Sequence, residues 1–313
     1  MNIFITGSTG CVAHYVIEQL LRDTDHQLFL FYKNISKFKQ PFAEHPRVTL
    51  VHGDMMALEP VRPWVLQADV IVHLAAGWIS NAAYETNVRD TLELFRMAAE
   101  GRCKQVIYFS TASVLDENNR PLQAAGEIGS EYIRSKFQMR QRLSESPLHD
   151  RTVVIYPTAI IGGSARHPYS HLGEALQNLD EALRWLRFIS LDAGCHFIHA
   201  HDLAQATLHF IAQPPTGFTE YVLGHDYLTL RQMLKQLAQA YGYSMPLQIS
   251  LPTALIVKLV ELIKRDMTAW DRFCLQYRHF RNHVTRPTDL GLISPYQTLA
   301  QCVAPYVQKK PTV

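Results

Sequence analysis

Thr6-Gly7-Ser8-Thr9-Gly10-Cys11-Val12-Ala13 follows the apolar run Ile3–Thr6 and opens a segment whose apolar residues have helical spacing. This order of strand, glycine turn and helix suits the binding of a pyrophosphate. Gly7 permits a tight turn, and Gly10 lets the backbone approach phosphate at the helix N-terminus, where free N–H groups favour negative charge. Ala13 is small enough for the helix to pack closely against the strand. We therefore expect phosphate contacts from Gly7, Ser8, Thr9, Gly10, Cys11 and Val12.

Strand–turn–helix units that bind no ligand share this pattern, so the context of the turn matters. Apolar runs rich in β-branched and aromatic residues alternate with stretches of helical spacing through the first half of the chain. The predicted strands are Ile3–Thr6, Leu28–Tyr32, Val48–His52, Val70–Leu74, Gln105–Ser110 and Thr152–Tyr156. The predicted helices include Val12–Leu21, Ala82–Ala99 and Tyr132–Leu143. Continuously apolar strands separated by helices predict an α/β fold, a Rossmann-type doubly wound parallel sheet covered on both faces.

Beyond Pro157 the pattern becomes mostly helical. The predicted helices are Leu172–Leu186, Asp202–Ala212, Leu230–Tyr241 and Thr253–Lys264, with brief strands at Phe197–Ala200 and Glu220–Leu223. We predict a dinucleotide-binding core over residues 1–160, with a later return near 188–212. A smaller, mainly helical C-terminal substrate lobe is expected over 161–187 and 213–313.

The composition excludes several classes of protein. The chain has 313 residues, of which 47% are hydrophobic, enough for a large buried core. Lys and Arg number 30 against 28 Asp and Glu, and this near-neutral balance gives no reason to expect nucleic acid or a membrane surface as partner. A predicted strand stands where a signal peptide would begin, and the longest apolar tract, residues 251–263, is too short to span a bilayer. Five scattered cysteines without CxxC spacing predict reduced thiols in a cytoplasmic protein.

The segment after the second predicted strand carries lysines and no acid. Sites for NAD usually place Asp or Glu there, on the 2′-hydroxyl of the adenine ribose. Residues 28–42 contain neither, whereas Lys33 and Lys37 suit a 2′-phosphate. The pattern favours NADP(H), with NAD(H) as the alternative because lysine runs are often simply solvated. Asp54, after the third strand, is expected to accept a hydrogen bond from the adenine amino group.

Tyr132 and Lys136 stand four residues apart, on one face of a predicted helix. A tyrosine hydroxyl with a pKa near 10 is a weak base at neutral pH, and a nearby ammonium group favours the phenolate. Tyr132 can then exchange a proton with an alcohol or a carbonyl while hydride moves, and Lys136 can bond the nicotinamide ribose. The strand end Ser110-Thr111-Ala112-Ser113 supplies hydroxyls for the substrate oxygen. YxxxK alone occurs by chance, but the ordered set of glycine turn, hydroxyl-bearing strand end and YxxxK is specific.

In this order the motifs resemble the extended short-chain dehydrogenase/reductase family, which includes the NAD-dependent epimerase/dehydratase group. Further matches are Gly53-Asp54, Val72–Ala76, Asn87, Ser110–Val114, Tyr156–Gly162, Phe197–Ala204 and Asp289–Gly291. The resemblance implies that Thr111, Tyr132 and Lys136 are the catalytic residues. It also implies cofactor contacts from Met55, Leu74, Ala75, Ala76, Asn87, Lys136, Tyr156, Pro157, Thr158 and Ile160.

Departures from the family pattern bear on the substrate. Asp90 replaces the middle glycine of the family's NxxGT, and Tyr156 replaces the arginine before the proline. The family's sugar 4,6-dehydratases carry an Asp-Glu pair after the catalytic threonine. Here those positions are Ala112 and Ser113, which counts against a dehydratase. We expect Trp78 and Ser113 to lie in the substrate pocket.

His199, His201 and Asp202 imitate a metal site because the two histidines stand two apart on a predicted strand. The family resemblance instead gives Asp202 a structural place at the start of a helix. No further cluster completes a ligand set, so we predict no metal.

The leading hypothesis is an NADP(H)-dependent oxidoreductase that transfers hydride between the nicotinamide cofactor and a small-molecule carbonyl or alcohol. An NAD-dependent nucleotide-sugar epimerase would use the same Thr/Tyr/Lys groups and stays an alternative. A non-catalytic dinucleotide-sensing regulator is a third, although such proteins typically lose the Tyr/Lys pair. The sequence leaves the substrate, the direction and the oligomeric state open. A homodimer fits, since relatives often pair through the helices that carry Asn87 and Tyr132.

Overall fold

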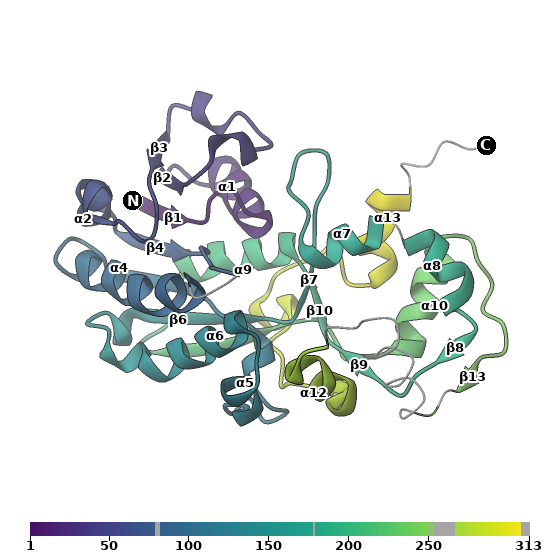
Figure 1. The fold of residues 1–313 in the computed structure, drawn as a ribbon. Coiled ribbons are helices and arrows are strands. Elements are labelled where there is room, and N and C mark those ends of the chain that lie inside the picture. Colours follow the sequence, from purple (N-terminus) through teal and green to yellow (C-terminus); the bar gives the residue numbers. More distant parts are fainter. Residues whose placement is uncertain (79–81, 178, 251, 253–266, 308–313) are drawn as a thin grey trace.

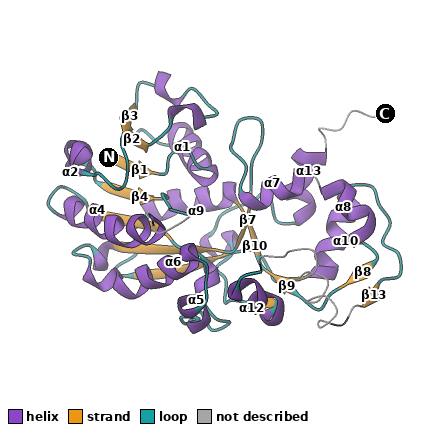
Figure 2. Ribbon diagram, viewed as in Figure 1, coloured by secondary structure: helices purple, strands orange, loops and turns teal. Residues whose placement is uncertain are grey.

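The computed structural model describes residues 1–78, 82–177, 179–250, 252 and 267–307. A sheet covered by helices on both faces forms one part of the molecule, on the left in Figure 1, and a smaller set of helices and short strands lies beside it. Figure 2 shows that strands dominate the interior of the first part and helices its outside. The N-terminus belongs to the sheet part.

The main sheet contains seven strands among the described residues, and every neighbouring pair is parallel. In spatial order they are β11 (Thr219–Leu223), β6 (Thr152–Pro157), β5 (Gln105–Phe109), β4 (Val70–His73), β1 (Asn2–Thr6), β2 (Gln27–Tyr32) and β3 (Val48–His52). The chain order reverses between β1 and β4, which is the switch point of a doubly wound sheet. In such sheets a ligand crevice forms outside the carboxyl ends of the strands.

Two apolar layers hold helices on the two faces of this sheet. On one face α2 (Arg62–Gln67), α4 (Asp90–Ala99) and α6 (Glu131–Arg142) cover alternate strand residues such as Phe4 and Val106. On the other, α1 (Cys11–Asp23) and α9 (Ala200–Ala212) pack against each other and cover residues such as Ile5. Burial on both faces explains why the strands are continuously apolar rather than alternating.

The second part is built mostly after β6. Its helices are α7 (His171–Gln177), α8 (Leu179–Leu186), α10 (Leu230–Ala240), α12 (Ala269–Tyr277) and α13 (Leu299–Val307). Its short strands are β7 (Ala159–Ile161), β8 (Ile189–Ser190), β9 (Gly194–Cys195), β10 (Phe197–His199), β12 (Leu228–Thr229), β13 (Ile249–Ser250) and β14 (His279–Phe280). A separate apolar cluster, with Leu183, Leu237 and Val303 among its buried residues, joins α8, α10 and α13.

The predicted strands of the first half are confirmed, and each lies in the main sheet. The predicted helix over 82–99 is α3 (Ala82–Tyr84), a π-helical turn at Glu85–Arg89, and α4. The one expected over 172–186 is divided into α7 and α8. The helix predicted over 253–264 lies outside the described residues.

One boundary needs correction. Residues 219–223 were expected in the substrate lobe, yet they form β11 at the edge of the main sheet, paired with β6. A short apolar strand has no local signal for which sheet it joins, so this pairing depends on tertiary packing. The remaining division into core and lobe stays a proposal. In the part of the chain that the structure describes, no helix has the length and apolar character needed to cross a membrane.

Candidate active site

A cavity of about 750 Å³ lies at the carboxyl ends of β1, β4 and β5, where the strand order reverses. This volume is within the usual range for small-molecule sites. From the first half of the chain its lining includes Gly7, Gly10, Cys11, Val12, Ala13, Lys37, Leu74, Ala76, Trp78, Phe109, Ser110, Thr111, Ser113, Ser130, Tyr132, Ile133 and Lys136. From the second half it includes Pro157, Thr158, Ile160, Pro168, Tyr169, Ser170, His171 and Leu172. No Asp or Glu appears among these described lining residues, so the walls are compatible with an anionic ligand.

The glycine turn has the geometry that a phosphate needs. Gly7 has a φ of 64°, and a Cβ there would lie 2.7 Å from the backbone nitrogen of Ala75. Gly10 is the N-cap of α1, and because it has no side chain it cannot bond the free N–H groups at the start of that helix. Those donors therefore stay available where Cys11, Val12 and Ala13 line the cavity, and the helix dipole adds to their attraction for an anion. The residues present fit the pyrophosphate of a dinucleotide.

A buried hydrogen-bond chain fixes the strand ends around this turn. Thr6 Oγ1 accepts the N–H groups of Leu74 and Ala75, each at 3.1 Å, so its own proton goes to His73 Nδ1 at 2.9 Å. His73 Nε2 then donates to Thr91 Oγ1 at 3.0 Å. Burial lowers the pKa of His73 to about 3, which keeps the imidazole neutral in this tautomer. β1, β4 and α4 are thereby held in one arrangement beside the cavity.

Tyr132 and Lys136 lie in the first two turns of α6, whose N-cap Ser130 accepts the N–H of Ile133. Both line the cavity, as their four-residue spacing predicts. Lys136 Nζ donates to the carbonyl of Phe109 at 2.9 Å and to the hydroxyl of Tyr108 at 3.3 Å. An ammonium has three donors, so one remains for a ligand.

Burial dominates the electrostatics of this pair. It lowers the pKa of Lys136 to about 7 and raises the pKa of Tyr132 above its ordinary value. The expectation that the ammonium of Lys136 and the positive charge of the oxidised nicotinamide favour the phenolate of Tyr132 stays a prediction. Burial favours the protonated phenol of Tyr132, and the hydrogen bonds of Lys136 go to Tyr108 and Phe109.

Thr111 stands directly beyond β5, facing the same cavity. It is the N-cap of a 3₁₀ turn at Ala112–Val114, and its hydroxyl oxygen accepts the N–H of Ser113 at 3.3 Å. Accepting that bond leaves the Thr111 proton free to donate to a substrate oxygen. Ser113, expected in the substrate pocket, also lines the cavity.

Asn87 lies behind the cavity wall and clamps the segment that follows β4. Its Oδ1 accepts the N–H of Gly77, and its Nδ2 donates to the carbonyl of the same residue, both at 2.8 Å. Nδ2 also donates to Ser135 Oγ at 2.9 Å, on α6. The π-helical turn at Glu85–Arg89 carries Asn87, and such turns are frequent at functional sites because they re-aim one residue. Asn87 therefore joins α6 to the Gly77–Trp78 segment.

Trp78 stacks on the ring of Tyr132, with centroids 4.0 Å apart and planes 14° from parallel. His171, at the start of α7, meets the indole edge-on at 4.6 Å. All three side chains line the cavity. The indole is still 52% exposed, so much of its surface is available to a ligand. The sequence predicted that Trp78 lies in the substrate pocket, but it did not predict that Trp78 stacks on Tyr132.

The loop over residues 162–170 closes one side of the cavity, and the sequence analysis did not single it out. His167 stacks on Tyr15 of α1 at 3.8 Å and bonds Glu18 at 2.7 Å. Arg166 bonds the side chain of Gln40, next to the lysine segment. The adjacent Gly162-Gly163 pair, directly after a strand, was the available signal for a loop here. Pro168, Tyr169 and Ser170 of this loop line the cavity.

A family model for the NAD dependent epimerase/dehydratase family matches residues 3–224, well over half of the chain. The chain belongs to this family. It is therefore an NAD(P)-dependent enzyme of the extended short-chain dehydrogenase/reductase type, and its coenzyme is a nicotinamide dinucleotide. No curated protein sequence matches the chain significantly.

Solved structures share the fold at low sequence identity. The terminal R domain from the myxalamid PKS-NRPS biosynthetic pathway has a TM-score of 0.73 at 18% identity, over 98% of this chain and 89% of that one. A UDP-glucuronic acid 4-epimerase from Bacillus cereus has a TM-score of 0.71 at 14% identity, over 98% of each chain. A dTDP-glucose 4,6-dehydratase from Streptomyces venezuelae, solved with NAD, has a TM-score of 0.68 at 18% identity, over 99% of this chain and 98% of that one.

Two lysines expected near the adenine ribose of the family's coenzyme differ in their surroundings. Lys33 pairs with Asp54 at 2.6 Å, and neither residue lines the cavity. Lys37 does line it and has no carboxylate within ion-pair distance among the described residues. His14 of α1 holds this segment, because its Nδ1 donates to the carbonyl of Gly10 and its Nε2 accepts the N–H of Lys39.

Several other residues expected as cofactor contacts lie outside the cavity lining. Ser8 is buried and donates to the carbonyl of Phe31 at 2.7 Å. Tyr156 is buried, and its hydroxyl donates to Glu220 at 2.5 Å. Thr9, Met55, Ala75 and Asn87 are also outside the lining, whereas Leu74, Ala76, Pro157, Thr158 and Ile160 are part of it.

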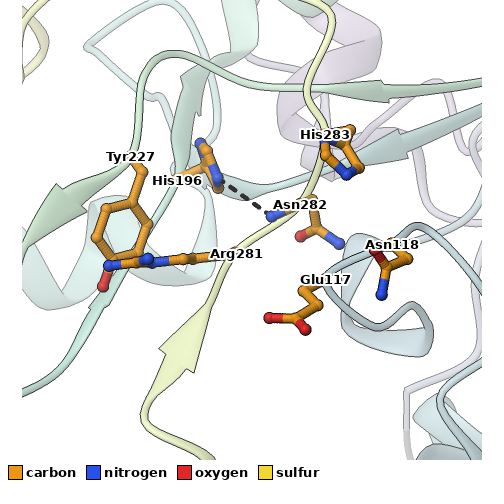
Figure 3. A pocket seen from close by; sticks show the side chains of 7 residues that line it. All are labelled: Glu117, Asn118, His196, Tyr227, Arg281, Asn282 and His283. Atoms are coloured by element: carbon orange, nitrogen blue, oxygen red, sulfur yellow. Dashed lines mark hydrogen bonds between the residues drawn. The ribbon is translucent and has the colours of Figure 1, made fainter.

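A second cavity, of about 530 Å³, is lined by residues from distant parts of the chain (Figure 3). It is lined by Glu117, Asn118, His196, Tyr227, Arg281, Asn282 and His283. His196 Nε2 accepts the N–H of Asn282 at 3.2 Å, and Asn282 Nδ2 donates to the carbonyl of Asp116 at 2.9 Å. The Arg281 guanidinium lies 4.4 Å from the ring centroid of Tyr227. Among the described residues the two cavities share no lining residue. The bonds of Asn282 join the loop after the Thr111 turn to His196.

The hydrogen bonds and ring contacts of His199, His201 and Asp202 hold the start of α9 in place. Asp202 lies in the first turn of α9, fully buried, and accepts bonds from His225 at 2.9 Å and Ser294 at 2.8 Å. His199 is the N-cap of that helix and stacks on Tyr296. Among the described residues no group of His, Cys, Asp and Glu side chains has the arrangement of a metal site.

Proposed function

We propose that this protein is an NADP(H)-dependent oxidoreductase that transfers hydride between the nicotinamide cofactor and a carbonyl or alcohol substrate. The observation that carries the proposal is the shared cavity. Thr111, Tyr132 and Lys136 line it together with the Gly7–Gly10 turn, at the switch point of the sheet. A phosphate-binding helix end, a proton donor and a hydroxyl anchor are the parts that hydride transfer to a carbonyl needs.

When bound, the reduced nicotinamide supplies a hydride, with its electron pair, to the carbonyl carbon. The π bond of the carbonyl breaks, and its oxygen takes the proton of the Tyr132 hydroxyl. Thr111 donates a hydrogen bond to the same oxygen and orients it. Lys136 has one donor left beyond its bonds to Tyr108 and Phe109, and this donor suits the ribose of the cofactor.

In carbonyl reduction Tyr132 is the proton donor. Its raised pKa keeps the phenol protonated, which is the form that donates. Lys136, whose pKa burial lowers to about 7, lines the same cavity. In alcohol oxidation the same oxygen of Tyr132 accepts the proton.

NADP(H) is favoured over NAD(H) by the charges near the end of β2. Lys37 faces the cavity without an ion-pair partner among the described residues, and Asp54 forms an ion pair with Lys33. Nucleotide-sugar epimerisation with NAD is the second candidate. It is supported by the named activity of the Bacillus cereus structure, which has the same fold.

Replacement of Tyr132 by Phe tests the proposal. The expected result is a loss of at least about 100-fold in kcat, the lower range for a missing general acid, with an unchanged dissociation constant for NADPH. Steady-state NADPH oxidation with a carbonyl panel and calorimetric titration give the two readouts. Retained turnover in this variant would refute the assigned role. NAD found bound to the purified protein, with turnover of a nucleotide sugar and of no carbonyl, would favour the epimerase instead.

A further inference from the structure

Resting on the proposed function, we propose that the cavity is specific for an uncharged aromatic carbonyl compound, whose ring stacks on Trp78. The three solved structures above include enzymes named for nucleotide sugars, which carry a diphosphate. The walls of this cavity point to a different chemical class. Three sets of contacts carry the inference.

The first is the aromatic surface next to the proton donor. Trp78 lies parallel to the ring of Tyr132, 4.0 Å away, and His171 meets the indole at a 71° interplanar angle. A substrate whose carbonyl reaches the Tyr132 hydroxyl therefore has its neighbouring atoms beside the indole. Aromatic pairs gain energy beyond the area they bury, because the edge of one ring is positive and the face of the other negative.

The second is that Trp78 is positioned rather than loose. It follows Gly77, whose N–H and C=O are both bonded to the buried amide of Asn87. The same amide bonds Ser135, and Ser135 Oγ donates to the carbonyl of Tyr132 at 2.8 Å. One side chain thus fixes the segment of the indole relative to the segment of the phenol. Such preorganisation lowers the entropic cost of stacking a ligand.

The third is the charge of the walls. Lys37 and Lys136 are the only Lys or Arg residues among the described residues that line the cavity. Lys37 follows β2 at the glycine-turn end, and Lys136 already bonds Phe109 and Tyr108. A diphosphate bound beyond the nicotinamide would need arginine forks or several backbone donors to offset its desolvation. The described lining contains no arginine, and its apolar side chains include Ile133, Ile160 and Leu172.

The test compares benzaldehyde with cyclohexanecarbaldehyde, which have the same carbon skeleton size and differ in aromaticity. The wild-type protein should reduce benzaldehyde with a kcat/KM about threefold to tenfold higher, the ratio expected of one aromatic pair. Trp78→Ala should lower the ratio by about threefold to tenfold, and Trp78→Phe should lower it less. Because the ratio cancels any uniform loss of activity, it isolates recognition of the ring from placement of Tyr132. Trp185→Ala removes a tryptophan that is 75% exposed on α8 and serves as the matched control, with the ratio unchanged.

A binding measurement without cofactor separates this inference from the proposed function. Calorimetric titration should show benzamide binding more tightly than cyclohexanecarboxamide, and Trp78→Ala should abolish the difference. Benzamide preference without turnover of either aldehyde would support the aromatic site and overturn the reductase function. Equal kcat/KM for the two aldehydes would overturn the inference and leave the function standing. With saturating NADP+ added to occupy the glycine turn, displacement of benzamide by micromolar UDP-glucose would also overturn it, because the rest of the cavity would then accept a diphosphate.

Discussion

Removal of the Asn87 side chain should destabilise the protein far more than removal of an exposed asparagine that makes similar bonds. Asn87 is fully buried, and Asn87→Ala deletes three hydrogen bonds, two to Gly77 and one to Ser135, all between 2.8 and 2.9 Å. These bonds connect the chain after β4 with α6, so their loss affects two elements of the cavity wall.

The magnitude follows from these contacts. Each intramolecular hydrogen bond contributes about 1 kcal/mol net, which gives about 3 kcal/mol for the set. Gly77 is only partly buried, so water can bond its freed N–H and C=O and reduce the loss. The small cavity left by the amide acts in the opposite direction. We expect a decrease of about 2–4 kcal/mol in the free energy of unfolding.

Equilibrium urea unfolding, followed by near-ultraviolet circular dichroism, measures this change. Asn34→Ala is the matched control, because Asn34 Oδ1 also accepts two bonds, from Ser36, at an exposed site. That variant should lose less than about 1 kcal/mol, the usual range for an exposed cap. If Asn87→Ala lost no more than Asn34→Ala, the clamp would not hold these segments together.

Three further predictions rest on other contacts. The stability of the wild type relative to Lys136→Met should rise between pH 7 and 10, because the unfolded lysine binds a proton that the folded one, with a pKa of about 7, has released. Urea unfolding at several pH values measures this, and a constant difference would contradict it. Gly7→Ala should lower the melting temperature more than Gly217→Ala. Both glycines have positive φ, but only at Gly7 would a Cβ lie within 3 Å of backbone atoms. Equal shifts of the melting temperature in the two variants would refute the close approach at Gly7. Lys37→Ala should weaken NADPH binding about tenfold or more and leave NADH binding unchanged, whereas Lys33→Ala should have a small effect because that lysine pairs with Asp54. Calorimetric titration of both variants decides, and equal losses would remove the distinction between the two lysines.

The parts of the fold that depend on the sequence over a few neighbouring residues could be predicted from the sequence. A strand buried on both faces must be continuously apolar, and a helix packed on a sheet repeats its apolar residues every three to four positions. Runs such as Val48–His52 and Thr152–Tyr156 therefore predicted strands of the main sheet. The four-residue spacing of Tyr132 and Lys136 likewise brought both to one cavity, because helix geometry alone fixes that relation.

Relations between distant segments had no such cause. The sequence offered Lys33, Lys37 and Asp54 as separate ligands, but the ends of β2 and β3 bring Lys33 to Asp54 and leave Lys37 at the cavity. It offered Asn87 as a cofactor contact, yet the π-helical turn aims this amide at Gly77 and Ser135. The partner of an ion pair or of a buried amide depends on tertiary packing, and the periodicity of apolar residues in the sequence does not predict it.

The sequence by itself determined the order of strands and helices, the glycine turn at a helix start and the helical spacing of Tyr132 and Lys136. These features depend on backbone conformation over a few residues, which the local pattern specifies. Only the tertiary structure decided that Trp78 covers Tyr132, that residues 162–170 close the cavity and that β11 joins the main sheet. Such contacts join residues far apart in the chain, and they form because folding buries apolar surface and pairs polar groups across elements.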